Sequence, residues 1–180
     1  MNVQVKYTYQ DLLTTPDDLL RYELFDGELI KSRAPNTLHQ QAVGNLLLVF
    51  LNFAEPRSLG RVYARLDVYF DEETVVEPDI FFVSKDRLHI IDEQKVNGAP
   101  DVVIEIISES TESRDRGFKF KRYAQEGVKE YWIVDPVNKT VEVYELKATG
   151  FVLAGKFEGK DEIRSPYFSG LKLTANKIFE

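Results

Sequence analysis

A glutamate within an apolar run is the first residue of this sequence that suggests chemistry. Glu105 lies in segment 102–107, which reads Val-Val-Ile-Glu-Ile-Ile. A run that is apolar at both alternating positions is typical of a strand covered on both faces of a sheet. A carboxylate there costs free energy unless it is paired, protonated or bound to a metal. Two interpretations stay open: a structural glutamate, in an ion pair or at the open end of the strand, and a metal-binding one.

A second acidic residue stands at the start of another apolar run. Asp79 follows Pro78 and precedes segment 80–83, which reads Ile-Phe-Phe-Val. Two strands that each carry one carboxylate can bring the two groups together at neighbouring positions of a sheet. Two carboxylates and water molecules are sufficient to hold Mg²⁺. Asp79 is therefore a candidate metal ligand together with Glu105, although an aspartate at a strand start also commonly caps a turn.

Asp101 is a third acid, and its spacing separates it from this pair. It stands four residues before Glu105 on the same expected strand. The two side chains would share a face but lie roughly 13 Å apart, at about 3.3 Å per residue. They cannot chelate one ion, so we interpret Asp101 as a strand-entry residue.

The main basic cluster of the sequence follows the Glu105 strand. It comprises Arg114, Arg116, Lys119, Lys121 and Arg122. In a helix, Asp115, Lys119 and Arg122 share one face. One interpretation is a solvated charged face with an Asp115–Lys119 pair. The other is that Lys119 points back at the carboxylates, near a helix start that favours anions.

Two further residues are weaker candidates for the same site. His39 falls in the first turn of an expected helix, outside its apolar stripe, where a histidine is most often a polar surface residue. Glu23 falls in a short expected strand and is equally ambiguous. Both are retained as supporting candidates, either as a further metal ligand or as a phosphate contact.

The segments that must position these residues alternate between helix and strand. A short helix is expected over 9–13, a hairpin over 22–31 with its turn at Asp26-Gly27, and an amphipathic helix over 36–54. Strands are expected over 61–65 and 67–70 (or one bent strand), 79–83, 101–107, 130–134, 140–146 and 151–157. A loop is expected over 88–98, with a helical turn in it as an alternative. A second long helix is expected from 108–113 to about 126, ended by Gly127. This order predicts an α/β (α+β) fold with a mixed β-sheet flanked by helices.

Length and composition limit the classes of protein. The 180 residues predict a single domain over 1–180. No cysteine is present, which excludes disulfides, thiolate metal sites and a cysteine nucleophile. No apolar stretch approaches a membrane span and no leader pattern is seen, so we expect a cytoplasmic protein with no membrane partner. The net charge of −7 argues against non-specific nucleic-acid binding.

Several segments, taken in order, resemble one known family. They are 22–28 (Tyr-Glu-Leu-Phe-Asp-Gly-Glu), His39, 77–80 (Glu-Pro-Asp-Ile), 99–108 (Ala-Pro-Asp-Val-Val-Ile-Glu-Ile-Ile-Ser), 115–119 (Asp-Arg-Gly-Phe-Lys) with Tyr123, and 127–136 (Gly-Val-Lys-Glu-Tyr-Trp-Ile-Val-Asp-Pro). Together they resemble the bacterial Uma-type family of "putative restriction endonucleases", in the PD-(D/E)XK nuclease superfamily. The resemblance runs from about Tyr7 to Phe179, and the segments 100–108 and 130–136 are its most specific parts.

The resemblance implies a restriction-endonuclease-like core and a site on its sheet. Asp79 matches the aspartate of the superfamily motif and Glu105 matches its (D/E) position. Where the superfamily usually has lysine, two residues later, this chain has Ile107. In some relatives the lysine has moved to the following helix, which makes Lys119 the matching candidate.

Two functional hypotheses follow from the residues and the resemblance. The first is an endonuclease that uses Mg²⁺ or Mn²⁺ to hydrolyse DNA, with Asp79 and Glu105 as metal ligands and Lys119 as the third catalytic group. Residues Arg114 to Arg122 would then form a local positive wall despite the acidic net charge. The alternative, motivated by Ile107 and by that charge, is a non-catalytic binding or scaffold domain that retains the fold. The oligomeric state stays open, with a homodimer as one alternative.

Overall fold

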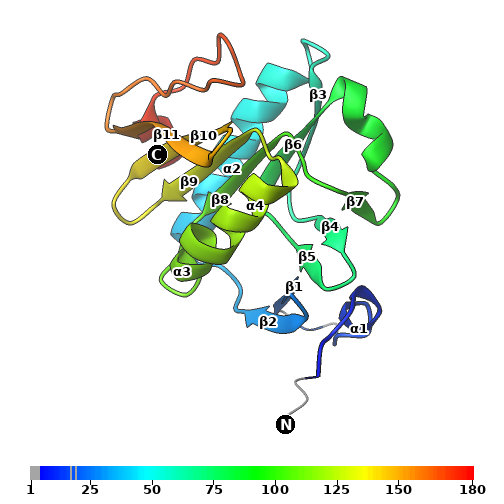
Figure 1. Ribbon diagram of the computed structural model, residues 1–180. Coiled ribbons are helices and arrows are strands. Elements are labelled where there is room, and N and C mark those ends of the chain that lie inside the picture. The colour runs from blue at the N-terminus through cyan, green and yellow to red at the C-terminus, as the bar shows by residue number, and fades with distance from the viewer. Residues whose placement is uncertain (1–4, 17, 19) are drawn as a thin grey trace.

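The structure is a computed structural model that describes residues 5–16, 18 and 20–180. Within these residues the strands form two sheets (Figure 1). The five-stranded sheet has the order β2 (Glu28–Ser32), β1 (Arg21–Phe25), β5 (Thr74–Val76), β4 (Asp67–Asp71), β7 (Lys95–Asn97). The six-stranded sheet has the order β11 (Gly150–Glu158), β10 (Thr140–Lys147), β9 (Glu130–Asp135), β8 (Val102–Ile106), β6 (Ile80–Ser84), β3 (Gly60–Tyr63). A mixed α+β fold is thereby confirmed.

Helices cover both faces of the six-stranded sheet (Figure 1). The long helix α2 (Thr37–Ala54) packs on one face, and α3 (Glu112–Arg114), η2 (Asp115–Lys119) and α4 (Phe120–Glu126) lie on the other. Short helices complete the chain: α1 (Tyr9–Leu12), η1 (Lys85–Ile90) and η3 (Ala175–Ile178). Among the described segments, no helix combines the length and the apolar character needed to cross a membrane.

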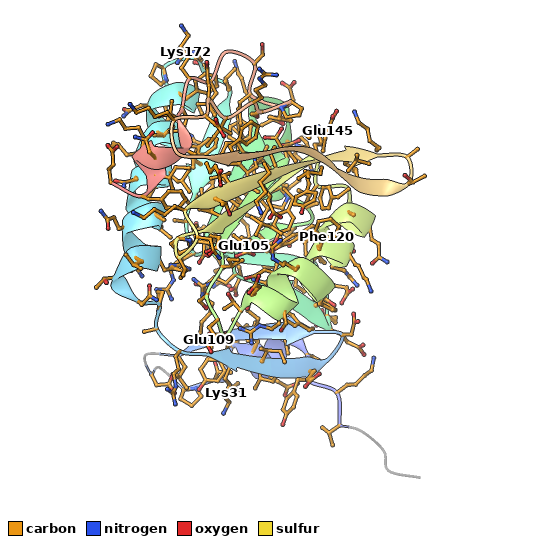
Figure 2. The ribbon with its side chains drawn as sticks, turned by 90° about the vertical axis from the view of Figure 1, so that its left-hand side faces the viewer. Lys31, Glu105, Glu109, Phe120, Glu145 and Lys172 are labelled. Carbon is orange, nitrogen blue, oxygen red and sulfur yellow. The ribbon has the colours of Figure 1, made fainter. Side chains whose placement is uncertain are left out.

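Strand β8 is buried on both faces, as its apolar run predicts. Val102, Ile104 and Ile106 belong to the core cluster under α2. Val103 and Ile107 belong to the cluster on the opposite face, with Tyr123 of α4. Because side chains alternate along a strand, Glu105 faces the α4 side. Figure 2 shows Glu105 in the interior, between the sheet and the helical segment that carries Phe120.

The first hairpin and helix α2 form where the sequence predicts them. Asp26 and Gly27 have φ angles of 52° and 85°, so both central residues of the turn are left-handed, as a type I′ hairpin requires. Helix α2 begins after Asn36, whose side chain accepts a hydrogen bond from the amide of His39. Gly127 ends α4 with a φ of 87°, the left-handed conformation that glycine adopts most easily.

The middle of the chain differs from the expectation. Strands β3 and β4 belong to different sheets, so the alternative of one bent strand is wrong. Segment 88–98, expected as a loop with a helical turn as an alternative, contains the end of the helical turn η1 and, unexpectedly, the strand β7. Strand β7 buries only Val96 in its three residues, and so short a strand leaves no periodic pattern to detect. Strand β5 was likewise not expected, although it joins the hairpin to β4.

A candidate active site at the end of strands β6 and β8

Asp79 and Glu105 lie side by side. Strands β6 and β8 are antiparallel with Ile80 opposite Ile104, so the register places Asp79 opposite Glu105. The amide nitrogen of Asp79 lies 3.4 Å from Oε2 of Glu105. The two residues are 3% and 1% exposed. The structure thus places the two acidic residues opposite each other on neighbouring strands, as the sequence predicts.

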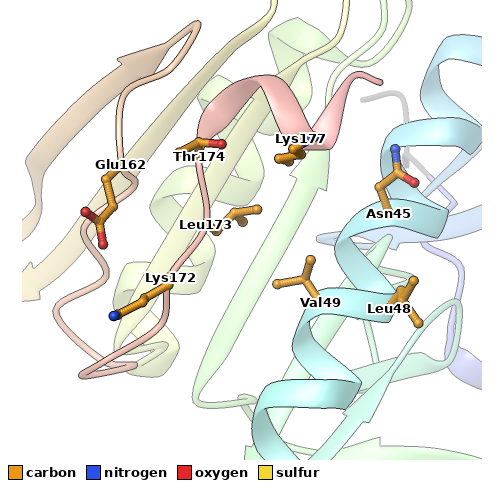
Figure 3. A pocket seen from close by; sticks show the side chains of 8 residues that line it. All are labelled: Asn45, Leu48, Val49, Glu162, Lys172, Leu173, Thr174 and Lys177. Carbon is orange, nitrogen blue, oxygen red and sulfur yellow. The ribbon is translucent and has the colours of Figure 1, made fainter.

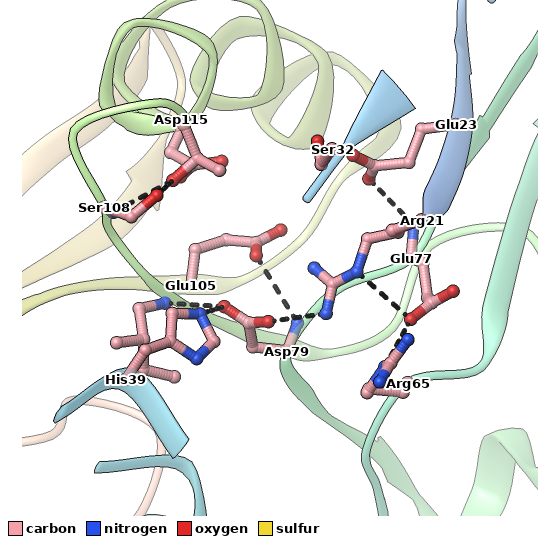
Figure 4. A network of polar contacts seen from close by, with 12 residues as sticks. Arg21, Glu23, Ser32, His39, Arg65, Glu77, Asp79, Glu105, Ser108 and Asp115 are labelled. Carbon is pink, nitrogen blue, oxygen red and sulfur yellow. Dashed lines mark hydrogen bonds and ion pairs between the residues drawn. The ribbon is translucent and has the colours of Figure 1, made fainter. Parts of the chain in front are cut away.

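Asp79 is held as an ionised carboxylate by donors on both oxygens (Figure 4). Nη2 of Arg21 donates to Oδ1 at 2.9 Å. Oδ2 accepts from the amide of Ile106 at 2.9 Å and lies 3.0 Å from Nε2 of His39. Burial opposes the charged form, but His39, Arg21 and the Ile106 amide outweigh it and lower the pKa of Asp79 to about 2.

Glu105 has a different electrostatic environment. Its Oε1 accepts hydrogen bonds from Nζ of Lys119 at 2.9 Å and from the hydroxyl of Tyr123 at 2.7 Å. Burial raises the pKa of Glu105 to about 8, and the carboxylates of Asp115 and Asp79 add to this rise while Lys119 opposes it. The two neighbouring acids therefore have pKa values displaced in opposite directions, which is common at functional sites.

Lys119 lies at the centre of a buried cluster of acids. Its Nζ is 2.9 Å from Oε1 of Glu105, 2.9 Å from Oε1 of Glu23 and 3.7 Å from Oδ1 of Asp115. Burial by itself would lower the pKa of Lys119, but these carboxylates outweigh it and raise the pKa above its usual range. The side chain is only 3% exposed, so the expectation that Lys119 is solvated is wrong, whereas the Asp115–Lys119 pair of that interpretation is present.

A π-helical turn positions Lys119. The segment η2, Asp115–Lys119, is wound as a π-helix between the α-helical segments α3 and α4. Single π turns inside helices occur frequently at functional sites. The hydroxyl of Tyr131 donates to the carbonyl of Asp115 at 3.1 Å, which fixes the start of this turn against β9. Both ends of the turn, Asp115 and Lys119, are thereby buried.

The two supporting candidates also reach the site. His39 is 5% exposed and contacts Asp79, so the expectation of a polar surface residue is wrong. The apolar face of this helix was predicted to include Leu38, which is in fact half exposed. Glu23 is buried and accepts a hydrogen bond from the amide of Glu77 at 3.0 Å in addition to its contact with Lys119.

Arg21 is a site residue that the sequence analysis missed. It contacts Asp79 through Nη2 and Glu77 through Nε, at 2.9 Å and 3.2 Å. A signal was available, because residues two apart on a strand share a face. Arg21 therefore had to lie on the same face of β1 as Glu23.

An open cleft of about 570 Å³ adjoins the buried acids. Arg21 and His39, the two side chains that contact Asp79, line its floor. The other lining residues are polar or small for the most part: Ser32, Arg33, Ala34, Pro35, Asn36, Ser108, Glu109, Ser110 and Thr111. Hydroxyl and guanidinium groups around a cleft favour an anionic ligand.

The basic helical segment does not form the expected positive wall. Arg116 is paired with Glu142 and Glu112, and Lys119 is buried. Arg122 contacts Asp71 and Glu126. Arg114 donates to Oγ of Ser32 at 2.7 Å, at the edge of the cleft. The positive charge beside the cleft thus comes from Arg21, Arg33 and Arg114 rather than from the whole segment.

The donor set suits a divalent cation in type. Mg²⁺ prefers oxygen ligands and keeps part of its water, so Asp79 and Glu105 are sufficient protein ligands. In the described part of the chain, however, no group of three or more acidic or histidine side chains is arranged around one point. Protein donors contact the oxygens of both carboxylates, chiefly Arg21 on Asp79 and Lys119 on Glu105. A cation at this position must therefore compete with side chains that carry positive charge.

With this geometry established, comparisons with known proteins identify the family. Residues 8–176 match the Uma2 family, which is described as "Putative restriction endonuclease". The chain belongs to this family. The resemblance inferred from the sequence segments is thereby confirmed. Among curated proteins, no sequence matches the chain significantly.

A solved structure has the same fold as this Uma2 family member. It is the crystal structure of "a putative nuclease belonging to DUF820" from Anabaena variabilis. The TM-score is 0.80 at 22% sequence identity, with 96% of this chain and 97% of that chain covered. The two chains therefore share their architecture over nearly their whole length.

A second cleft, of about 550 Å³, lies between α2 and the C-terminal segment (Figure 3). Leu48, Val49 and Leu173 give it an apolar lining, with Lys172 and Lys177 among its other residues. None of the buried acids described above lines it. It is therefore separate from the site at Asp79 and Glu105.

Proposed function

We propose that this chain is a metal-dependent nuclease that hydrolyses phosphodiester bonds in DNA with Mg²⁺ or Mn²⁺. The observation that carries the proposal is the meeting of Asp79 and Glu105 at neighbouring positions, with Lys119 on Glu105. A cleft lined by Arg21 and His39 adjoins these acids. Membership of a family described as "Putative restriction endonuclease" supports the same reaction class.

Asp79 and Glu105 would hold the metal ion, with the carbonyl of Ile106 as an additional oxygen nearby. A bound ion polarises a phosphate oxygen and lowers the pKa of a coordinated water. Asp79 is suited to this role because its low pKa keeps it ionised at neutral pH. Glu105 has a raised pKa, so its proton and a metal ion compete for the same carboxylate.

Lys119 would supply the positive charge that the superfamily usually places two residues after Glu105. Ile107, at that position, is buried in the core and carries no charge. Lys119 holds Oε1 of Glu105, so it first of all positions this carboxylate. From the same place it would orient the attacking water or stabilise negative charge on the phosphate. Glu23 and Asp115 act through Lys119, because they hold its ammonium.

His39 is proposed to contact the substrate. Asp79 is ionised and only accepts hydrogen bonds, so Nε2 of His39 must carry the proton of their contact. Nδ1 of His39 is buried and has no hydrogen-bond partner among the described residues. A hydrogen-bonding position of His39 is therefore open at Nδ1, and His39 lines the cleft, which supports a substrate contact from this side chain.

A plasmid-cleavage assay with Mg²⁺ or Mn²⁺ tests this function. Asp79→Asn and Glu105→Gln are expected to abolish cleavage because each removes one charged ligand. Glu93→Gln, at an exposed position, is the matched control and should cleave normally. DNA binding by a wild-type protein that does not cleave would contradict the nuclease proposal and favour the non-catalytic binding domain.

A further inference from the structure

Arg21 stands between the open cleft and the buried carboxylate of Asp79. Its Nη2 lies 2.9 Å from Oδ1 of Asp79, and its Nε lies 3.2 Å from Oε1 of Glu77 (Figure 4). The same side chain lines the cleft and is mostly buried. One guanidinium thus faces both the candidate metal ligand and the space for a substrate.

Arg21 and a divalent cation compete for the same oxygen. Oδ2 of Asp79 is already engaged by the amide of Ile106 and by His39. The other oxygen, Oδ1, is contacted by Arg21. A cation that binds Oδ1 would therefore lie next to the positive charge of the guanidinium. The guanidinium and a divalent cation on the same carboxylate oxygen would repel each other strongly in a buried site. The contact therefore weakens cation binding for as long as Arg21 keeps it.

The side chain has a second anchor that lets it leave Asp79 without losing all its contacts. Nε of Arg21 contacts Oε1 of Glu77, and Arg65 contacts that same oxygen at 2.8 Å. The guanidinium is planar and turns as one unit about the Cδ–Nε bond, so the Nη groups can leave Asp79 while the Nε atom stays close to Glu77. A phosphate in the cleft would offer these groups a bidentate partner.

We propose that Arg21 is a positioning residue that couples phosphate binding in the cleft to cation binding at Asp79. A DNA phosphate draws Nη2 of Arg21 from Asp79 towards the cleft, and Oδ1 becomes available to the cation. This inference rests on the proposed function, since it takes DNA as the ligand of the cleft. Coupling between two ligands is reciprocal, so the cation must raise the affinity for DNA by the same factor.

Calorimetric titration of the full chain with Ca²⁺, with and without a saturating short DNA duplex, tests the coupling. A gel confirms that the duplex stays intact during the titration. The duplex is expected to strengthen Ca²⁺ binding by about tenfold. A duplex with an uncharged methylphosphonate backbone should not strengthen it. Fluorescence anisotropy should show the reciprocal gain in DNA affinity when Ca²⁺ is added, and this measurement needs no variant.

The variant Arg21→Ala should bind Ca²⁺ about tenfold more tightly in the absence of DNA and should lose the coupling. Arg21→Gln serves the same purpose if the alanine variant does not fold. Arg164→Gln is the matched control, because Arg164 is exposed and is not among the residues that line the cleft. It should keep both the Ca²⁺ affinity measured without DNA and the coupling.

The inference would be overturned by a Ca²⁺ affinity of the wild type that DNA leaves unchanged, or by full coupling in Arg21→Ala. Failure of the proposed function is a separate result, because it appears as absence of plasmid cleavage by the wild type in Mg²⁺ and Mn²⁺. Cleavage without coupling overturns the role of Arg21 alone. Absence of any Ca²⁺ binding in both wild type and variant overturns the cation site and this inference with it.

Discussion

The ammonium of Lys119 lies 2.9 Å from Oε1 of Glu105, and both side chains are almost completely buried. The same ammonium also contacts the carboxyl groups of Glu23 and Asp115, so three buried acids share one cation. Removing Lys119 differs from removing one of the acids, because no other lysine among the described residues is buried. We therefore expect the stability of the site and its proposed activity to depend on the same residue, Lys119.

Lys119→Met should destabilise the protein strongly. It leaves the buried carboxyl groups of Glu23, Asp115 and Glu105 without the cation that all three contact, and breaking a buried ion pair in this way costs about 3–5 kcal/mol. Chemical denaturation at pH 7 measures the loss in the free energy of unfolding. Lys121→Met, at the exposed position two residues later, should change the stability little. Equal effects of the two substitutions would contradict the central place of Lys119.

A double variant separates the structural from the catalytic role of Lys119. Lys119→Met combined with Asp115→Asn removes one of the uncompensated charges and should recover part of the lost stability. Metal-dependent cleavage should nevertheless remain lower by orders of magnitude, because the positive charge is still missing. Recovery of cleavage together with stability would mean that Lys119 acts only through the fold.

Glu105→Gln should abolish Mn²⁺ binding without unfolding the protein. The raised pKa of Glu105, about 8, means that the fold favours its neutral form, and glutamine resembles that form. An acid with a raised pKa in the folded state lowers stability as the pH rises from its ordinary value towards 8. At pH 7 the variant is therefore expected to be at least as stable as the wild type. Calorimetric titration with Mn²⁺ checks the first point, and unchanged binding would contradict the assignment of Glu105 as a ligand.

Asp67→Asn should stabilise the protein at neutral pH. Burial, and then the carboxylates of Glu77 and Glu23, raise the pKa of Asp67 to about 6. The folded state therefore binds the proton more tightly, and stability is lost as the pH rises from about 4 to 6. The substitution avoids this loss and should raise the free energy of unfolding at pH 7 by about 1–3 kcal/mol. Denaturation curves at pH 7 and pH 4 should show the gain shrinking at the lower pH.

Glu142→Gln should have the opposite pH dependence. Burial opposes the ionised form of Glu142, but the hydrogen bond from Arg116 outweighs it and lowers the pKa to about 2. Such a group stabilises the fold above its ordinary pKa, and this contribution disappears as the pH falls towards 2. The variant should be less stable than the wild type at pH 7 and equally stable at the acid end. A constant difference across that range would contradict the ionic origin of the contribution.

Glu130→Gln should loosen the C-terminal segment. The carboxylate of Glu130 accepts from Nε1 of Trp132 at 2.6 Å, from Oγ of Ser165 at 2.6 Å and from the amide of Tyr167 at 2.8 Å. Glutamine offers one acceptor oxygen in place of two, and a buried donor left unpaired costs about 1–3 kcal/mol. Limited proteolysis should cut the variant faster near residues 165–168. Glu145→Gln, on the neighbouring strand, is the control and should be cut at the wild-type rate.

Local patterns determined the elements that carry the two acids. The apolar runs after Asp79 and around Glu105 each specify a strand, and a carboxylate just before one run and within the other indicates where the strands meet. The turn at Asp26-Gly27 and the periodic face of α2 are equally local, because each depends on backbone preferences or side-chain spacing within a few residues. These features were therefore available from the sequence.

Only the tertiary structure decided which side chains contact the two acids. Arg21 and His39 reach Asp79 across 58 and 40 residues of sequence, and no local pattern encodes such contacts. The π turn that brings Lys119 onto Glu105 departs from the regular helical spacing on which the face of that helix was assigned. Short strands such as β7, which buries one side chain, form because a neighbouring strand supplies their hydrogen bonds. The sequence thus determined which acids meet, whereas the packing of distant segments determined which cations hold them.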